Sequence, residues 1–380
     1  MNSPTPPSTL PSPPHYAAID ALRGLAILGV VMVHASQKAV PTSPLMQQIT
    51  AQGARGVQLF YLLSALTLFL SLQFRRSTGR RAPLSHFFIR RFFRIAPAFY
   101  AAIVGYLLLN GTSPHYWAPD GIKGWHILST FLFINGWTPE TITSVVPGGW
   151  SIAVEMTFYL CVPFLFLWLS SIPRTLIALV LSLLLAKAMS VAALGVLTPL
   201  YPDSQSYLLH GFVFLWFFSQ LPVFLLGILI YHTLQRFPQI HSHLALALYP
   251  VAVFLSVAFF QATTYSDLLP QHFLFSVALA FLVLAVYHKP HALLVNPILC
   301  WIGRVSFSMY LIHIAVLTFL SHLGSKWFDL KGNWQCVLIT LIATALSLAL
   351  ASLSYQFIEQ PGIKLGRQLT ARLQSRPTNA

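Results

Sequence analysis

The sequence predicts an all-α fold, namely a polytopic membrane helix bundle with about ten transmembrane helices plus one short partial or re-entrant helix. Its composition is the first reason, because 56% of the 380 residues are hydrophobic and only 8% are charged. A soluble domain would carry about 25% charged residues. The second reason is that the apolar residues form continuous runs rather than the alternating segments of a transmembrane β-barrel.

Ten apolar runs are long enough to cross the hydrocarbon core as helices. In chain order they are residues 17–36, 57–74, 94–109, 150–169, 175–197, 212–234, 244–260, 273–287, 306–323 and 334–355. An eleventh segment, residues 126–137, is short and contains Asn135 and Gly136. We therefore expect it to form the partial or re-entrant helix.

Basic residues predict the orientation, because cytoplasmic loops are enriched in Lys and Arg. With ten spans, the Arg-rich loop after the second run and the basic C-terminal segment fall on one side. Counting 126–137 as a full span would separate these two clusters. We therefore expect both termini to be cytoplasmic, with Arg23 nearer the cytoplasm and His34 nearer the outer side.

The chain ends suggest the domain organisation. Residues 1–15 are rich in Pro and Ser and lack Lys and Arg, which predicts a disordered cytoplasmic tail. The membrane domain is expected over residues 16–368, followed by a basic cytoplasmic tail over 369–380. The net charge of +14 comes from basic residues that flank apolar runs, so no nucleic-acid partner is expected.

No metal site is expected either. The three cysteines lie in apolar runs without metal-ligand or disulfide spacing, as expected for small core residues. They are Cys161, Cys300 and Cys336.

Arg23 and His34 are the first candidate site residues. Eleven residues apart on a helix, they would share one face and lie about 16 Å apart along the axis. Ionisable groups within the membrane usually face a bundle interior or an aqueous cavity. A cation that binds a cofactor and a neutral imidazole that takes a proton from a hydroxyl would fit this stripe. The alternative is that Arg23 snorkels to the interface and His34 caps the helix.

Glu155 is the acidic residue deepest within an apolar run, in the segment that begins at Trp150 and Ser151 and continues to Tyr159. A buried carboxylate needs a partner, and His34 or an Arg is the expected one. A His–carboxylate pair would orient a general base. The alternative is a purely structural ion pair.

Arg90, Arg91 and Arg94 precede the third run, and Arg91 and Arg94 share a helix face. Their guanidinium groups could bind phosphates in a bidentate manner. The alternative is that they only anchor the membrane surface.

Ser306, Tyr310 and His313 follow a helical i, i+4, i+7 pattern in the ninth run, so they should lie on one stripe. They could line the same cavity as Arg23 and His34. An interhelical hydrogen-bond network is an equally good interpretation.

These segments, in this order, resemble the membrane acyltransferase-3 family, whose members O-acylate bacterial envelope glycans. The Arg23-to-His34 spacing matches its Arg-ten-residues-His signature, and the Arg91-to-Pro97 segment looks like its Arg-x-x-Arg-Ile-x-Pro motif. Four further blocks are similar to family motifs and begin at Gly56, Trp150, Gly303 and Phe357. One departure is Gln58, where the family often has an acidic residue.

The resemblance implies an integral membrane enzyme of the bacterial cytoplasmic (inner) membrane. Its donor would be acyl-CoA, most simply acetyl-CoA, from the cytoplasm, and its acceptor a hydroxyl of a glycan or lipid-linked saccharide. His34 would be the catalytic base and Glu155 would support the centre. The candidate substrate- and CoA-binding residues are Arg23, Arg90, Arg91, Arg94, Trp150, Ser151, Tyr159, Ser306, Tyr310 and His313.

A different class of function also fits the residues. A transporter or flippase for a lipid-linked saccharide or small acid would need a similar aqueous cavity, with Glu155 and His34 as a proton relay. Such a protein would have no need for the Arg91/Arg94 grip on a CoA nucleotide, so binding of CoA discriminates between the two.

Overall fold

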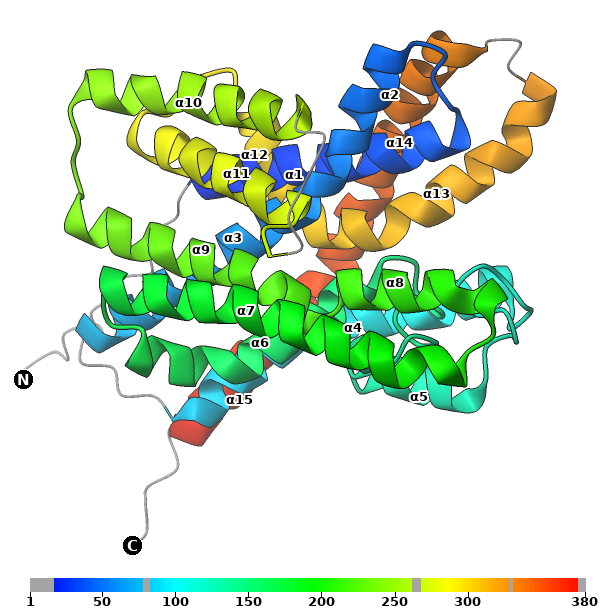
Figure 1. Ribbon diagram of the computed structural model, residues 1–380, viewed down its shortest axis with the longest axis horizontal. Coiled ribbons are helices and arrows are strands. Elements are labelled where there is room, and N and C mark those ends of the chain that lie inside the picture. Colours follow the sequence, from blue (N-terminus) through cyan, green and yellow to red (C-terminus); the bar gives the residue numbers. More distant parts are fainter. Residues whose placement is uncertain (1–16, 78–82, 262–267, 328–330, 375–380) are drawn as a thin grey trace, which may run out of the picture.

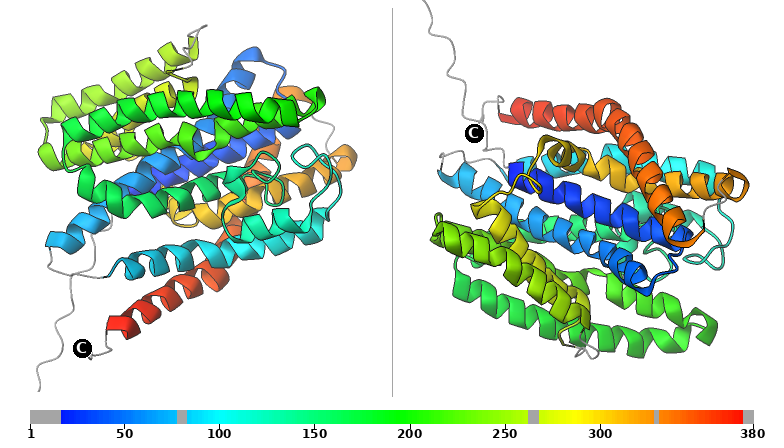
Figure 2. Two further views of the ribbon diagram at one scale, coloured as in Figure 1. Left: turned by 60° about the horizontal axis from the view of Figure 1, so that its bottom comes forward. Right: turned by 90° about the horizontal axis from the view of Figure 1, so that it is seen from above.

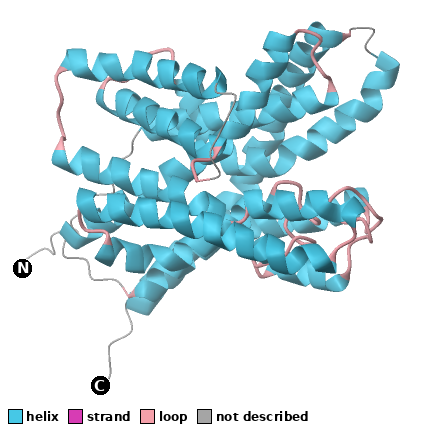
Figure 3. Ribbon diagram, in the orientation of Figure 1, coloured by secondary structure: helices cyan, strands magenta, loops and turns pink. Residues whose placement is uncertain are grey.

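The computed structural model describes residues 17–77, 83–261, 268–327 and 331–374, which fold into helices with no strand among them (Figures 1 and 3). The longer helices lie roughly along one direction, as expected for a bundle that crosses a membrane (Figure 2). The α-helices are α1 (Ala17–Lys38), α2 (Pro44–Ala51), α3 (Gly56–Ser77), α4 (Leu84–Asn110), α5 (Gly124–Phe131), α6 (Gly149–Trp168), α7 (Ile172–Leu197), α8 (Ser206–Leu215), α9 (Phe217–Arg236), α10 (Ser242–Gln261), α11 (Gln271–His288), α12 (Pro297–Arg304), α13 (Ser306–Trp327), α14 (Gly332–Ser354) and α15 (Gln360–Gln374).

Ten helical segments of the described chain are long and apolar enough to cross a membrane, which confirms the predicted polytopic all-α class. The segment expected to be a partial helix forms the short α5, followed by a single 3-10 turn at Asn135–Trp137. Asn135 is the first residue of this turn and is buried, and its side chain donates to the carbonyl oxygen of Ile142. A buried polar side chain such as that of Asn135 interrupts the apolar run, so the run is too short to cross the membrane as a helix.

The sixth predicted span is interrupted, which the sequence pattern did not predict. Trp216 has an extended backbone between α8 and α9. Side chains of the next turn satisfy the carbonyls that the break exposes: Ser219 donates to Val213 O and Gln220 to Phe214 O. Backbone groups within a membrane must be paired inside the protein, and these two bonds do so.

Helix α1 is central to the bundle and packs against α3, α12, α13 and α14 (Figure 2). The backbones of α1 and α12 come into close contact because each helix has a glycine at the interface, Gly24 in α1 and Gly303 in α12. A Cβ on Gly24 would lie 2.3 Å from Leu299 O, and one on Gly303 would overlap Asp20 O. Small residues allow such backbone contact between membrane helices. This packing holds α1, which carries Arg23 and His34, against the start of α13.

The described C-terminal segment continues as a helix after α14. A π-helical turn at Tyr355–Glu359 joins α14 to α15, which packs along α4 and crosses the expected domain boundary at residue 368. The start of α1 and the end of α15 lie toward the same end of the bundle (Figure 2). The tail predicted over residues 1–15 and residues 375–380 of the basic tail lie outside the described residues.

Candidate functional site

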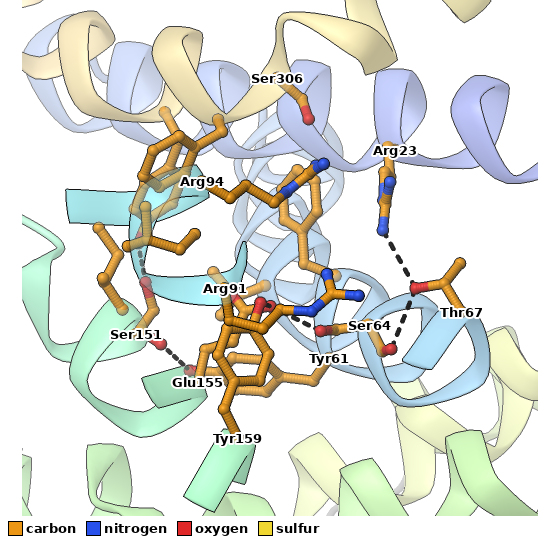
Figure 4. A pocket seen from close by; sticks show the side chains of 16 residues that line it. Arg23, Tyr61, Ser64, Thr67, Arg91, Arg94, Ser151, Glu155, Tyr159 and Ser306 are labelled. Atoms are coloured by element: carbon orange, nitrogen blue, oxygen red, sulfur yellow. Dashed lines mark hydrogen bonds between the residues drawn. The ribbon is translucent and has the colours of Figure 1, made fainter. Parts of the chain in front are cut away.

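Three arginines converge on one cavity, which we call the arginine cavity (Figure 4). The empty space among its lining residues, counted together with the solvent that adjoins it, is about 720 Å³. Arg23 comes from α1, and Arg91 and Arg94 come from α4. Its lining consists of Arg23, Val57, Phe60, Tyr61, Ser64, Thr67, Arg91, Arg94, Ile95, Ser151, Ile152, Glu155, Tyr159, Ser306, Phe307 and Tyr310. Three guanidinium groups against one carboxylate give the cavity a surplus of positive charge.

Glu155 organises the floor of the arginine cavity. Its Oε1 accepts hydrogen bonds from Ser64 Oγ and Tyr159 Oη, each at 2.6 Å (Figure 4). The guanidinium of Arg91 lies over the Tyr159 ring, 5.7 Å from its centroid, in cation–π geometry. Arg23 is held on the opposite side by a longer bond of 3.4 Å to Thr67 Oγ1. Arg23 and Arg91 are therefore positioned by a hydroxyl group and an aromatic ring, which leaves guanidinium donors for an anionic ligand.

Arg94 has a second acidic neighbour beyond the cavity lining. Glu359, from the π-helical turn, interacts electrostatically with Arg94 and accepts a hydrogen bond from Ser308 Oγ at 3.0 Å. The side chain of Glu359 is 1% exposed, so it is a buried structural partner of the cluster.

His34 and His313 lie together in a second, larger space, which we call the histidine cavity. Its empty space, counted together with the solvent that adjoins it, is about 2090 Å³. Most of its lining comes from α1, α3, α13 and the loops on either side of α5. His313 Nε2 lies 3.1 Å from His34 Nδ1, and the ring centroids are 5.1 Å apart. Trp150 and Gln58 also line this cavity.

The hydrogen bonds of the two histidines assign their tautomers. His34 Nδ1 faces Val30 O at 2.9 Å, and His313 Nδ1 faces Tyr310 O at 2.7 Å. A carbonyl oxygen only accepts, so both Nδ1 atoms carry the proton. His313 Nε2 is then unprotonated and acts as an acceptor. The single Nδ1–H of His34 is shared between Val30 O and His313 Nε2. His34 Nε2 is left as an unprotonated nitrogen, which is the form that a general base requires.

Of the two kinds of partner expected for Glu155, His34 is not one, whereas the arginines of the cavity interact with it electrostatically. Glu155 lines the arginine cavity, whereas His34 lines the histidine cavity and is oriented by Val30 O and His313. The Glu155 carboxylate instead accepts hydrogen bonds from two hydroxyl groups. The His34 imidazole contacts the imidazole of His313.

The other predicted site residues divide between the cavities. Ser151, Tyr159 and Ser306 line the arginine cavity, and Tyr310 lines both. Arg90 is not among the lining residues of either cavity, although it was grouped with Arg91 and Arg94. Arg90 is one position off the face that Arg91 and Arg94 share on α4, which explains the difference.

Sequence reasoning missed several lining residues. Ser64 and Thr67 are polar positions three apart in the apolar middle of α3, and this spacing was the available signal. The apolar members Val57 and Phe60 gave no signal, because they resemble any other core residue.

Comparison with known proteins identifies similar acyltransferases. Residues 16–355 match the family model described as an acyltransferase domain. The chain is 27% identical to the peptidoglycan O-acetyltransferase OatA of Listeria monocytogenes over 93% of this chain and 56% of that protein. It is 25% identical to YrhL of Bacillus subtilis, provisionally named a peptidoglycan O-acetyltransferase, over 91% of this chain and 55% of that one.

A Staphylococcus aureus (strain COL) protein, provisionally named an O-acetyltransferase, is 26% identical over 93% of this chain and 58% of its own length. The chain thus spans just over half the length of these curated relatives. The family match covers most of the chain, including Arg23, His34, the α4 arginines, Glu155 and the Ser306–His313 stripe. This chain belongs to the acyltransferase-3 family.

Proposed function

We propose that this protein transfers an acyl group, acetyl in the simplest case, from acyl-CoA on the cytoplasmic side to a hydroxyl of an envelope or secreted glycan. One observation carries the proposal: a cavity lined by three arginines and a cavity lined by two histidines meet inside one bundle. The first suits the phosphates of a CoA nucleotide, and the second suits deprotonation of a hydroxyl.

The donor is held by charge in this scheme. Arg91 and Arg94 present planar guanidinium groups from one face of α4, and Arg23 lies across the cavity from them (Figure 4). Guanidinium groups bind phosphate oxygens in a bidentate manner and remain charged when partly buried. The phosphates bind at this end, and the pantetheine arm extends toward the histidine cavity with the thioester at its tip.

Transfer follows from the tautomer of His34. Its Nε2 takes the proton of the acceptor hydroxyl as the oxygen attacks the thioester carbonyl. The new C–O bond forms, the C–S bond breaks, and the thiolate receives that proton to leave as free CoA. His313 Nε2 accepts the Nδ1–H of His34 throughout and so stabilises the imidazolium that forms.

The orientation is part of the proposal. If the arginine cavity faces the cytoplasmic CoA pool, the end of α3 is cytoplasmic and the loop after α4 is external. In a variant without the native cysteines, Ser77→Cys should resist a membrane-impermeant thiol reagent in intact cells, and Ser113→Cys should react with it. Both positions are exposed in the protein, so burial does not protect them. Labelling of Ser77→Cys from outside would reverse the orientation and separate the arginines from CoA.

The function itself is tested in membranes that contain the protein. Acetyl-labelled acetyl-CoA is added from the cytoplasmic face, and label in the glycan fraction and release of free CoA are followed together. Wild-type protein should transfer label, and His34→Ala should not. His322→Ala is the matched control, because His322 is exposed and bonds only to its own helix at Thr318 O. Equal transfer by His34→Ala and wild type would refute the proposal.

A further inference from the structure

The two cavities share only two lining residues, Val57 of α3 and Tyr310 of α13. Each side chain is 8% exposed, so both are part of the packed interior. The arginines lie on one side of this pair and the histidines on the other. We call Val57 and Tyr310 the partition between the cavities.

The Tyr310 ring is fixed in place by its hydroxyl group. Its Oη accepts from Ser151 Oγ at 2.8 Å and donates to Gly148 O at 3.1 Å. The Phe60 ring packs edge-on against it at 6.5 Å. Gly148 has a φ of 77°, and a Cβ there would lie 2.8 Å from Tyr310 Oη. The glycine thus permits both the left-handed turn before α6 and the close seat of the tyrosine hydroxyl.

The following step rests on the proposed function. If the CoA phosphates bind among the arginines and His34 is the base, the thioester end must pass between Val57 and Tyr310. Arg23 and His34 are about 16 Å apart along α1, so the arm has to bridge the partition in an extended form. The part of the arm next to sulfur is an unbranched chain. An opening that admits such a chain also admits an acetyl group, but it obstructs an acyl group with a branch or ring next to its carbonyl.

We propose that Val57 and Tyr310 are the residues that select the acyl group, admitting small unbranched acyl groups to His34 and excluding branched and aromatic ones. Selection occurs on the way through the partition, because the histidine cavity beyond it is the larger of the two and has room for a bulkier group. Tyr310 acts in this scheme as a wall and does not react with the acyl group.

The test compares acetyl-CoA with isobutyryl-CoA and benzoyl-CoA as donors. Release of free CoA is measured in membranes that contain the protein, so transfer to glycan and transfer to water are both counted. Wild-type protein should strongly prefer acetyl-CoA. Val57→Ala should raise the kcat/KM ratio of isobutyryl-CoA to acetyl-CoA roughly tenfold, the usual effect of adjusting a pocket by one or two carbon atoms. Tyr310→Ala should raise it further and admit benzoyl-CoA.

Two control variants remove similar volume away from the partition. Phe307 lines only the arginine cavity, and Ile314 lines only the histidine cavity. Phe307→Ala and Ile314→Ala should change the rates with both donors alike and leave the ratio unaltered. Val57→Ala keeps all hydrogen bonds of Tyr310, so it tests the partition even if Tyr310→Ala does not fold.

An unchanged donor ratio in a folded Val57→Ala protein that still uses acetyl-CoA would overturn the selection role and leave the proposed function intact. An equal rise of the ratio in the control variants would also overturn it, since the selection would then lie elsewhere. Wild-type membranes that release no CoA from acetyl-CoA would refute the proposed function, and the selection role with it.

Discussion

The arginine and histidine cavities differ in how they hold their charged and titratable groups. In the arginine cavity, hydroxyl groups hold Arg23 and Glu155, and the Tyr159 ring lies against Arg91. In the histidine cavity, two imidazoles bond to backbone carbonyls and to each other. The first arrangement suits binding of an anion, and the second fixes the tautomer of a base.

This contrast suggests that binding of the donor and proton transfer can be changed separately. The cavities touch only at Val57 and Tyr310. Changes in one cavity should therefore leave the property of the other largely intact, since effects of residues that share no partners are usually additive.

His34→Ala should have the largest effect. Loss of a general base costs about 10²- to 10⁴-fold in rate, and here it also removes the hydrogen-bond partner of His313 Nε2. We expect kcat for acyl transfer to fall by that factor while the KM for acetyl-CoA changes little. Steady-state kinetics with varied acetyl-CoA measure both. A comparable loss in donor affinity would show that the two cavities are not independent.

The Arg91→Lys/Arg94→Lys double variant should come next. Lysine keeps the charge but loses the planar fork, and one lost charge-assisted hydrogen bond costs about 1.5–3 kcal/mol, roughly ten- to a hundredfold in donor affinity. The KM for acetyl-CoA should rise by this factor and that for the acceptor should not. Arg236→Lys is the control, because Arg236 is exposed and packs over Phe237 outside both cavities. An unchanged donor KM would leave Arg23 as the main candidate for the phosphates.

Tyr159→Phe should have the smallest effect. It removes one of the two hydroxyl donors to Glu155 but keeps the ring beneath Arg91. We expect the melting temperature to fall by a few degrees, because a hydrogen bond contributes about 1 kcal/mol, and donor KM to rise less than tenfold. Tyr100→Phe, which loses a bond to Phe131 O elsewhere in the bundle, is the matched control. A loss of activity as large as that of His34→Ala would give Tyr159 a role in the chemistry itself.

The helical architecture was predictable because each membrane-spanning helix requires a long run of apolar residues. The number of spans and the short α5 followed from run length and from the polar residues of 126–137. The break at Trp216 was not predictable in this way. It depends on Ser219 and Gln220 reaching back to carbonyls of the preceding turn, and an apolar run looks the same with or without such a break.

The site was predictable in its polar members and less so in their pairing. Arg23, Arg91, Arg94 and Glu155 were recognisable because charge is rare inside these helices, and the structure gathers them around one cavity. The stripe that contains His313 was expected to line the same cavity as His34, but the direct contact of the two rings was not, since they are 279 residues apart in the sequence. The apolar residue Val57 lies in the motif block that begins at Gly56, but its place between two cavities could not be predicted from the sequence.

The most direct test of the division between the cavities is stabilisation of the purified protein by CoA. A ligand that binds only the folded state raises its stability by an amount set by its affinity, about 2.7 kcal/mol at a hundredfold excess over Kd. At one fixed CoA concentration, His34→Ala should show the same rise in melting temperature as wild type, and Arg91→Lys/Arg94→Lys should show a much smaller one. A full rise in the double variant together with a lost rise in His34→Ala would contradict the assignment of donor binding to the arginine cavity.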